Sequence, residues 1–143
     1  MNEALGSASL RYFYADQNEL TSFSQLNAPN LVRLHLHFNS MTGDIPDLSN
    51  MVNLTYLWAN NNQLTGYTAG SFTTMAALQR LDLSFNNLVS GAINQIISDL
   101  YDNYEANPRT GVTINLAGND SPDATAAERI SFLASNGWSI ITS

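Results

Sequence analysis

The sequence contains no cysteine and no lysine, and its five basic residues are all arginine. Without cysteine, the chain has no disulfide scaffold, no zinc ribbon and no thiol nucleophile. Charged residues make up 12% of the 143 residues, about half of the usual share, and the net charge is −7. This net charge argues against electrostatic binding to nucleic acid or anionic lipid, so we expect no nucleic-acid partner.

Long apolar runs are also missing. No stretch approaches the ~20 apolar residues of a membrane-spanning helix, so we predict no membrane insertion. Residues 1–6 lack the basic and apolar regions of a signal peptide, and none is predicted there. The chain is nevertheless 44% hydrophobic and long enough to bury one core. We therefore expect a single domain over residues 1–143.

Leucine and asparagine are abundant instead, with 18 of each. Many of them follow one frame, L-x-x-L-x-L-x-x-N-x-L. It occurs in four near-complete copies and a degenerate fifth, at residues 10–20, 31–41, 54–64, 78–88 and 111–121. The asparagines of the five copies are Asn18, Asn39, Asn62, Asn86 and Asn119. The frame recurs every 21 to 33 residues, and such a repeat predicts a solenoid, in which each copy forms part of one coil.

The frame resembles that of the leucine-rich repeat family, over about residues 5–143. The segment MTGDIP at residues 41–46 is similar to the LTGxIP turn of some repeats in that family. The resemblance implies an α/β solenoid of about five to six coils, with a parallel β-sheet on its concave face. It also implies a structural ladder of the frame asparagines, because an amide can satisfy backbone groups that leucine cannot.

Two segments depart from the coil pattern. Apolar residues recur at helical spacing near residues 91–106, and Asn107-Pro108 predicts the end of that helix. Residues 122–143 predict a helix and a strand that cap the last coil, with Ser121 as the helix N-cap. The N-terminus has no comparable cap. We therefore expect a longer parent protein with a preceding domain, or a neighbouring subunit at the N-terminal edge.

The third, fifth, seventh and eighth positions of each copy should face the concave side, because side chains alternate along a strand. In the first four copies, six of these sixteen positions are aromatic, against 10% of the chain, and both histidines lie among them. Surfaces rich in Tyr, Trp and Arg are typical of binding hot spots. We predict ligand binding by Tyr12, Tyr14, Arg33, His35, His37, Phe38, Tyr56, Trp58, Asn60, Asn61, Arg80, Asp82 and Phe85.

Metal binding and catalysis are weighed against this interpretation. The segment His35-x-His37 places two imidazoles on one face of a strand, with Asp16 or Asn60 nearby. No third strong ligand is obvious, so we predict no metal and no cofactor. A Ser/His/Asp set would need Asp82 and Ser84, which lie two coils or ~10 Å from the histidines. That separation exceeds hydrogen-bond reach, so we expect no enzyme.

The sequence therefore predicts a non-enzymatic recognition module for a protein or a glycan. Low charge, absent lysine and absent cysteine-rich caps favour a short domain of bacterial or phage type. A bacterial surface adhesin or a phage receptor-binding protein, extracellular or on a cell surface or virion, is the preferred version. Two alternatives stay open. One is a structural or oligomerisation module that docks through its uncapped N-terminal coil, and the other is an intracellular effector scaffold in the cytoplasm.

Overall fold

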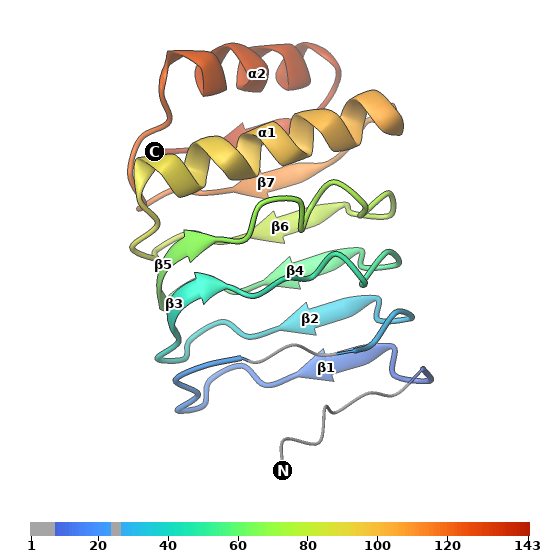
Figure 1. The fold of residues 1–143 in the computed structure, drawn as a ribbon, viewed down its shortest axis with the longest axis vertical. Helices are drawn as coiled ribbons and strands as arrows, with labels where there is room; N and C mark the ends of the chain where they lie inside the picture. Colours follow the sequence, from blue (N-terminus) through green and yellow to red (C-terminus); the bar gives the residue numbers. More distant parts are fainter. Residues whose placement is uncertain (1–7, 24–26) are drawn as a thin grey trace.

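Six short parallel strands form the main sheet of the protein. The computed structural model describes residues 8–23 and 27–143. The strand order β1-β2-β4-β6-β7-β8 follows the chain, so each coil adds one strand beside the last (Figure 1). The strands are β1 (Tyr12–Tyr14), β2 (Arg33–His35), β4 (Tyr56–Trp58), β6 (Arg80–Asp82), β7 (Thr113–Asn115) and β8 (Ser139–Ile141). The parallel sheet predicted from the frame is confirmed.

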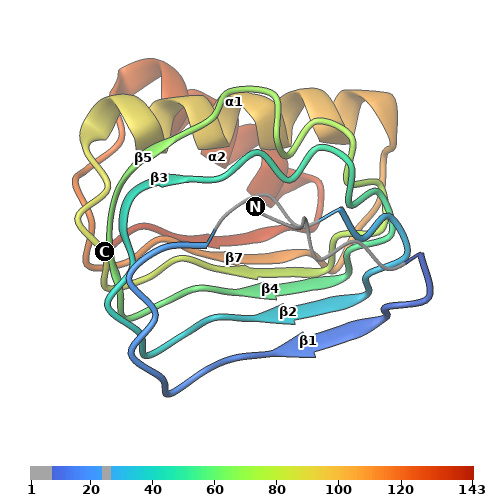
Figure 2. The same ribbon diagram turned by 60° about the horizontal axis from the view of Figure 1, so that its bottom comes forward.

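The opposite side of the solenoid carries a second sheet and two helices. β3 (Thr42–Ile45) and β5 (Gln63–Tyr67) pair in parallel, and α1 (Ser90–Ala106) continues this layer beside β5 (Figure 2). α2 (Ala124–Ser135) packs against α1 at the end of the stack farthest from β1. The segment MTGDIP was expected to turn, but most of it forms β3, because the equivalent segment of the next coil pairs with it.

The helices agree with the sequence pattern except at one cap. α1 ends at Ala106, directly before Asn107-Pro108, as predicted. The prediction of Ser121 as the N-cap of α2 is wrong. The helix begins at Ala124, so the residue before it, Asp123, accepts a hydrogen bond from the Ala126 amide at 2.8 Å. A carboxylate at this position satisfies an amide that has no partner within the helix.

The inward positions of the frame form one continuous core. The fourth and sixth positions of copies two to four alternate with the outward ones, and their residues are all buried, namely Leu34, Leu36, Leu57, Ala59, Leu81 and Leu83. α1 adds a buried apolar stripe to the same core. At the far end, Trp138 is buried and its indole N–H donates to the Arg109 carbonyl at 2.8 Å. The core is therefore covered at the C-terminal end by the predicted helix and strand.

The frame asparagines bond to neighbouring coils in a repeated pattern. Asn86 Oδ1 accepts the Leu64 amide at 3.0 Å, and its Nδ2 donates to the Ala59 and Leu83 carbonyls, each at 3.0 Å. The equivalent bonds occur at Asn39, Asn62 and Asn119. Asn18, in the first described coil, is exposed and donates to the Asp16 carbonyl at 2.9 Å. The bonds connect consecutive coils through the interior of the turns.

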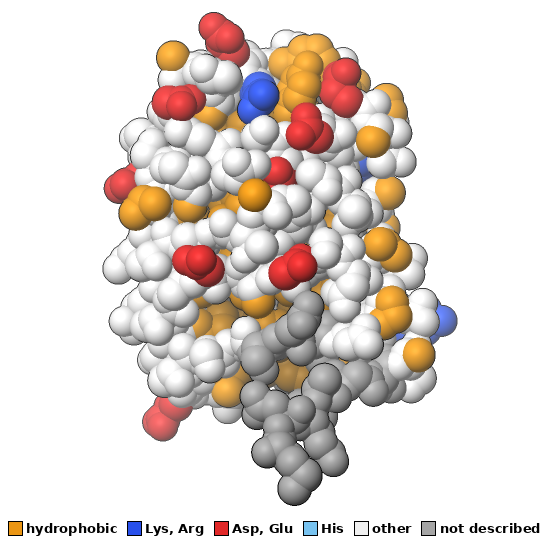
Figure 3. Space-filling view, in the orientation of Figure 1, with side chains coloured by type: hydrophobic (Ala, Val, Ile, Leu, Met, Phe, Trp, Pro, Cys, Tyr) orange, Lys and Arg blue, Asp and Glu red, His pale blue; other side chains and the backbone are white. Residues whose placement is uncertain are grey.

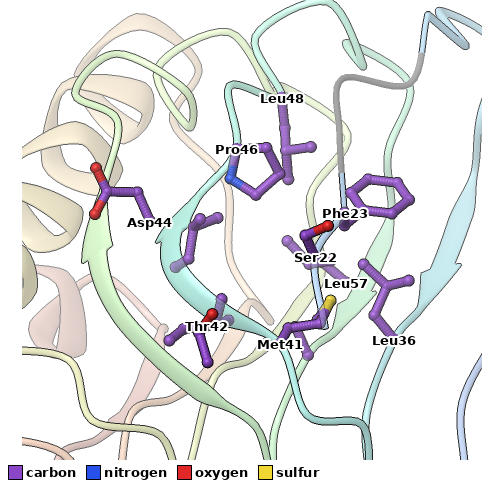
Figure 4. Close-up of a pocket in the computed structure, with 12 residues that line it drawn as sticks. Ser22, Phe23, Leu36, Met41, Thr42, Asp44, Pro46, Leu48 and Leu57 are labelled. Carbon is purple, nitrogen blue, oxygen red and sulfur yellow. The ribbon is translucent and has the colours of Figure 1, made fainter. Parts of the chain in front are cut away.

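A small cavity lies inside the solenoid, between the main sheet and β3. Figure 4 shows mainly apolar side chains around it, among them Phe23, Leu36, Met41 and Leu57. Its volume of about 80 Å³ is well below the 300–1,000 Å³ of typical ligand pockets. This cavity is therefore too small for a ligand of that kind.

Candidate binding face

The outward side chains of the main sheet stand in straight rows across the coils. Tyr12 lies opposite Arg33, which lies opposite Tyr56 and then Arg80. A second row runs Tyr14, His35, Trp58, Asp82, Asn115 and Ile141. Because the strands are in register, residues of one row are neighbours at about 4.8 Å. We call this surface the concave face.

Aromatic and imidazole rings pack against one another in the second row. The His35 ring lies 4.5 Å from the Tyr14 ring and 4.2 Å from the Trp58 ring, measured between centroids. His37 contacts Trp58 and Phe38 with centroids 6.0 and 5.5 Å apart. Tyr14 stays 55% exposed and Phe38 53% exposed. The rings are thus held in place by their neighbours while offering open edges to a partner.

Arg33 lies between two tyrosines in the first row. Its guanidinium carbon is 4.9 Å from the Tyr56 ring centroid and 5.9 Å from that of Tyr12. Such cation–π contacts stabilise the charge over the ring faces. The Tyr56 hydroxyl also donates to the Gln79 side chain at 3.3 Å. The row therefore presents a positioned cation flanked by aromatic surface.

The eighth position of each copy has a left-handed backbone. Phe38 and Phe85 have φ of 53°, Gln17 and Asn61 have φ of 55°, and Gly118 has φ of 73°. The conformation turns the chain after the strand. In the first four copies, the backbone amide of the eighth residue donates to the backbone carbonyl of the seventh residue of the next copy. A bulky residue is unusual with positive φ. Phe85 is 62% exposed there.

The Asp82 carboxylate, on β6, is hydrogen-bonded within the protein. Asp82 Oδ1 accepts from the Ser84 hydroxyl at 2.6 Å and from the Ser84 amide at 3.0 Å. Asn115 Nδ2 donates to Asp82 Oδ2 at 3.4 Å. Ser84, at the seventh position of this copy, is buried although the frame places it on the outward side. Its hydroxyl is covered because it bonds back to the neighbouring carboxylate.

Asp16 and the two histidines come together in the middle of the face. His37 Nε2 lies 3.7 Å from Asp16 Oδ2. Burial lowers the pKa of His35 below its usual value, and the nearby charges of His37 and Arg33 lower it further, against the opposing effect of Asp16. These surroundings therefore favour the neutral form of the His35 imidazole. The sequence frame placed Asp16 beside the pair, but only the structure shows how closely the side chains approach.

The remaining predicted residues are at least partly exposed. Asn60 and Asn61 follow β4 and are partly exposed, and Arg80 is exposed on β6. The face also extends to Ile141 on β8, which is 43% exposed and was not predicted. The repeat frame could not predict Ile141, because the cap contains no copy of the repeat. The alternation of side chains along the strand that follows Trp138 is a weak signal for it.

The opposite face differs in character. Figure 3 views the side of β3, β5 and α1, where acidic side chains are scattered among neutral and apolar ones. The aromatic and imidazole cluster described above therefore lies on the side away from this acidic surface. Within residues 8–23 and 27–143, no helix is both long and apolar enough to cross a bilayer.

Stacked parallel strands joined by an asparagine ladder define a solenoid repeat protein. A leucine-rich repeat family model matches residues 29–88, and a second one matches residues 77–100. Human Podocan-like protein 1 is 34% identical over 89 residues, which are 59% of this chain and 17% of that protein. The chain belongs to the leucine-rich repeat family.

A solved structure supports the same fold. The plant peptide hormone receptor RGFR1, in complex with RGF2, matches 77% of this chain with a TM-score of 0.57 and 24% identity. The match covers 21% of that receptor chain. The chain thus spans about a fifth or less of the length of both proteins. The likeness confirms an α/β leucine-rich repeat solenoid.

Proposed function

We propose that the chain is a non-enzymatic recognition module that binds a protein or a glycan through the concave face. The observation that carries the proposal is the exposure of Tyr12, Tyr14 and Phe38, each more than half exposed around the packed His35 and Trp58 rings. Rigid aromatic side chains give large contact area at low entropic cost. Their grouping on one face favours recognition over a scatter of unrelated exposed residues.

The backbone at Phe38 and Phe85 adds support. An L-residue in the left-handed conformation costs about 1–2 kcal/mol, whereas glycine adopts it freely. Both phenylalanines keep most of their ring exposed, so burial offsets little of that cost. Gly118 occupies the same position in the fifth copy. Phenylalanine in the second and fourth copies is better explained by contact with a partner than by stability.

The size of the face limits the partner. Five strands and three rows give a patch on the order of 300 Å², while a standard protein interface buries about 800 Å² per partner. A peptide, a glycan or a modest protein contact fits this area. The receptor of similar fold was solved with the peptide hormone RGF2, which makes a peptide or protein the first class to test.

The setting of the module is part of the proposal. We infer a single leucine-rich repeat domain over residues 1–143, with its cap at residues 122–143, in a protein outside the cell. A bacterial surface adhesin or a phage receptor-binding protein is the version that the low charge and the absent lysine favour. Sequencing of the parent reading frame and its neighbours tests this version: an export signal or a tail-fibre context is expected. A cytoplasmic operon without either would favour the effector scaffold.

Binding is tested with arrays of glycans and surface proteins. The double variant Tyr56→Ala/Trp58→Ala removes two central rings of the face. Phe132→Ala is the matched control, because Phe132 is a 40% exposed aromatic residue on the cap helix α2. We expect the wild-type protein and the control to bind a common target and the double variant to lose it. Equal binding by all three proteins would contradict the concave face as the site.

Docking through the first coil is a second candidate. β1 is an edge strand of the main sheet, and an edge strand can pair with another chain. A preceding domain or a neighbouring subunit would add a strand beside Tyr12–Tyr14. Mass measurement in solution separates this candidate from the first, since docking between copies predicts a dimer or a larger assembly. A stable monomer would count against it.

A further inference from the structure

Three side chains of two adjacent coils converge on the concave face. Asp16 and His37 hold the same position in consecutive copies, and His35 precedes His37 by two residues. One ligand-type atom from each side chain lies within 4.8 Å of the other two. The carboxylate thus supplies the third ligand that the sequence did not make obvious. The arrangement needs an explanation beyond aromatic packing.

Both imidazoles also contain nitrogen atoms that the protein leaves without a partner. His35 Nε2 and His37 Nδ1 are buried, and neither has a hydrogen-bond partner among the residues that the structure describes. The rings of Tyr14, Trp58 and Phe38 pack around the two imidazoles, and none of their polar atoms bonds to these nitrogens. Buried polar atoms are normally satisfied. His37 approaches Asp16 with Nε2, so an ion bound there would not satisfy its Nδ1, and the unpaired Nε2 of His35 is the atom that indicates a missing partner.

We propose that Asp16, His35 and His37 bind a divalent transition-metal ion, with zinc the best-fitting one. Zinc takes imidazole nitrogen and carboxylate oxygen at about 2.0–2.2 Å, in a tetrahedral arrangement. Ligand atoms of such a site lie roughly 3.4 Å apart by that geometry. His37 Nε2 and Asp16 Oδ2 are already 3.7 Å apart. The widest separation is at most 4.8 Å, so movements of about 1.4 Å would bring the ligand atoms to the spacing of a zinc site.

The protein would leave one coordination position open toward solvent. Three protein ligands around a tetrahedral ion leave a fourth position for water or for an atom of another molecule. The side chains of His37 and Asp16 are 18% and 26% exposed, so the site is reachable from the concave face. Magnesium and calcium prefer shells made of oxygen alone, and a site with two imidazoles discriminates against them.

The composition of the chain makes a direct test possible. The sequence holds two histidines and no cysteine, so any metal bound through imidazole must use one or both of His35 and His37. Untagged protein is titrated with ZnCl₂ by calorimetry, and with CoCl₂ while the visible absorption is recorded. We expect one ion per chain, movement of both histidine proton signals in nuclear magnetic resonance spectra, and no comparable binding of Mg²⁺ or Ca²⁺.

Variants then distinguish this site from weak surface binding. His35→Gln, His37→Gln and Asp16→Asn should each weaken Zn²⁺ binding at least about tenfold. Asp44→Asn, which changes an exposed carboxylate on β3, should leave it unchanged. Circular dichroism without metal checks that all four variants fold. The proposal is overturned if wild-type protein shows no saturable Zn²⁺ binding, or if the three ligand variants bind as tightly as the control.

Discussion

The asparagine ladder makes a quantitative prediction at Asn86. Replacing Asn86 by alanine removes three side-chain hydrogen bonds of 3.0 Å from a site that is 5% exposed. The two carbonyls keep a partner, because Ala59 also accepts from Asn62 and Leu83 also accepts from Asn119. The amide of Leu64 loses the partner that the Asn86 side chain supplies.

These bonds set the expected loss of stability. A buried amide without a partner costs about 1–3 kcal/mol, and each of the two remaining bonds contributes about 1 kcal/mol net. Asn86→Ala should therefore lower the free energy of unfolding by about 3–5 kcal/mol. Asn18→Ala is the matched control, since Asn18 is exposed and its one described bond goes to the Asp16 carbonyl. Its cost should be about 1 kcal/mol or less.

Urea unfolding followed by circular dichroism measures both variants against the wild-type protein. A third variant, Asn86→Asp, tests the direction of the bonds. Its carboxylate can accept the Leu64 amide but would face the Ala59 and Leu83 carbonyls without a donor. We expect it to be at least as destabilising as alanine near pH 7. If Asn86→Ala costs no more than Asn18→Ala, the ladder does not hold the coils together.

Three further predictions concern other features of the coils. Phe38→Gly should stay within about 1 kcal/mol of wild-type stability, because glycine suits a φ of 53°, while weakening partner binding in the array assay. Gly118→Ala should lower the free energy of unfolding by about 2 kcal/mol or more, since φ is 73° and an added Cβ would lie 2.8 Å from Phe85. The loss should be smaller in a protein that already carries Phe85→Ala, which lacks that ring. Burial and then the bond to Asp99 raise the pKa of Tyr67, so wild-type stability should fall above about pH 10, and Tyr67→Phe should lose less over that range in urea unfolding.

Much of the coil architecture follows from spacing alone. Leucine at fixed intervals determines which positions face inward, and Leu34 and Leu81 are buried as the frame requires. The second sheet did not follow, because residues 42–45 contain threonine, glycine and aspartate, with no apolar alternation. Their strand forms through pairing with residues 63–67 of the next coil. Pairing between coils is a tertiary effect that a single segment does not encode.

The sequence pattern likewise did not predict the hydrogen bonds of the buried polar side chains. Apolar spacing predicted α1, yet the helix also buries Asp99 and Asn103. Asp99 accepts the Tyr67 hydroxyl at 2.7 Å, and Asn103 accepts from Arg109 at 2.7 Å. These partners lie on other coils or after the helix, so helical periodicity gives no hint of them. The same limit applies to Asp16, whose distance from the histidines depends on side-chain rotamers.

Along the solenoid, the polar side chains of the concave face differ in whether the protein already satisfies their hydrogen bonds. This difference restricts the candidate site to part of the face. Toward β6 and β7, Asp82, Ser84 and Asn115 satisfy one another, so a partner would have to break existing bonds to use them. Toward β1 and β4, the packed rings leave open edges, and two imidazole nitrogens lack partners among the described residues. A contact gains free energy only from groups not already satisfied by the protein. Recognition should therefore centre on the first three coils, where the metal ligands and the exposed aromatic rings share one surface.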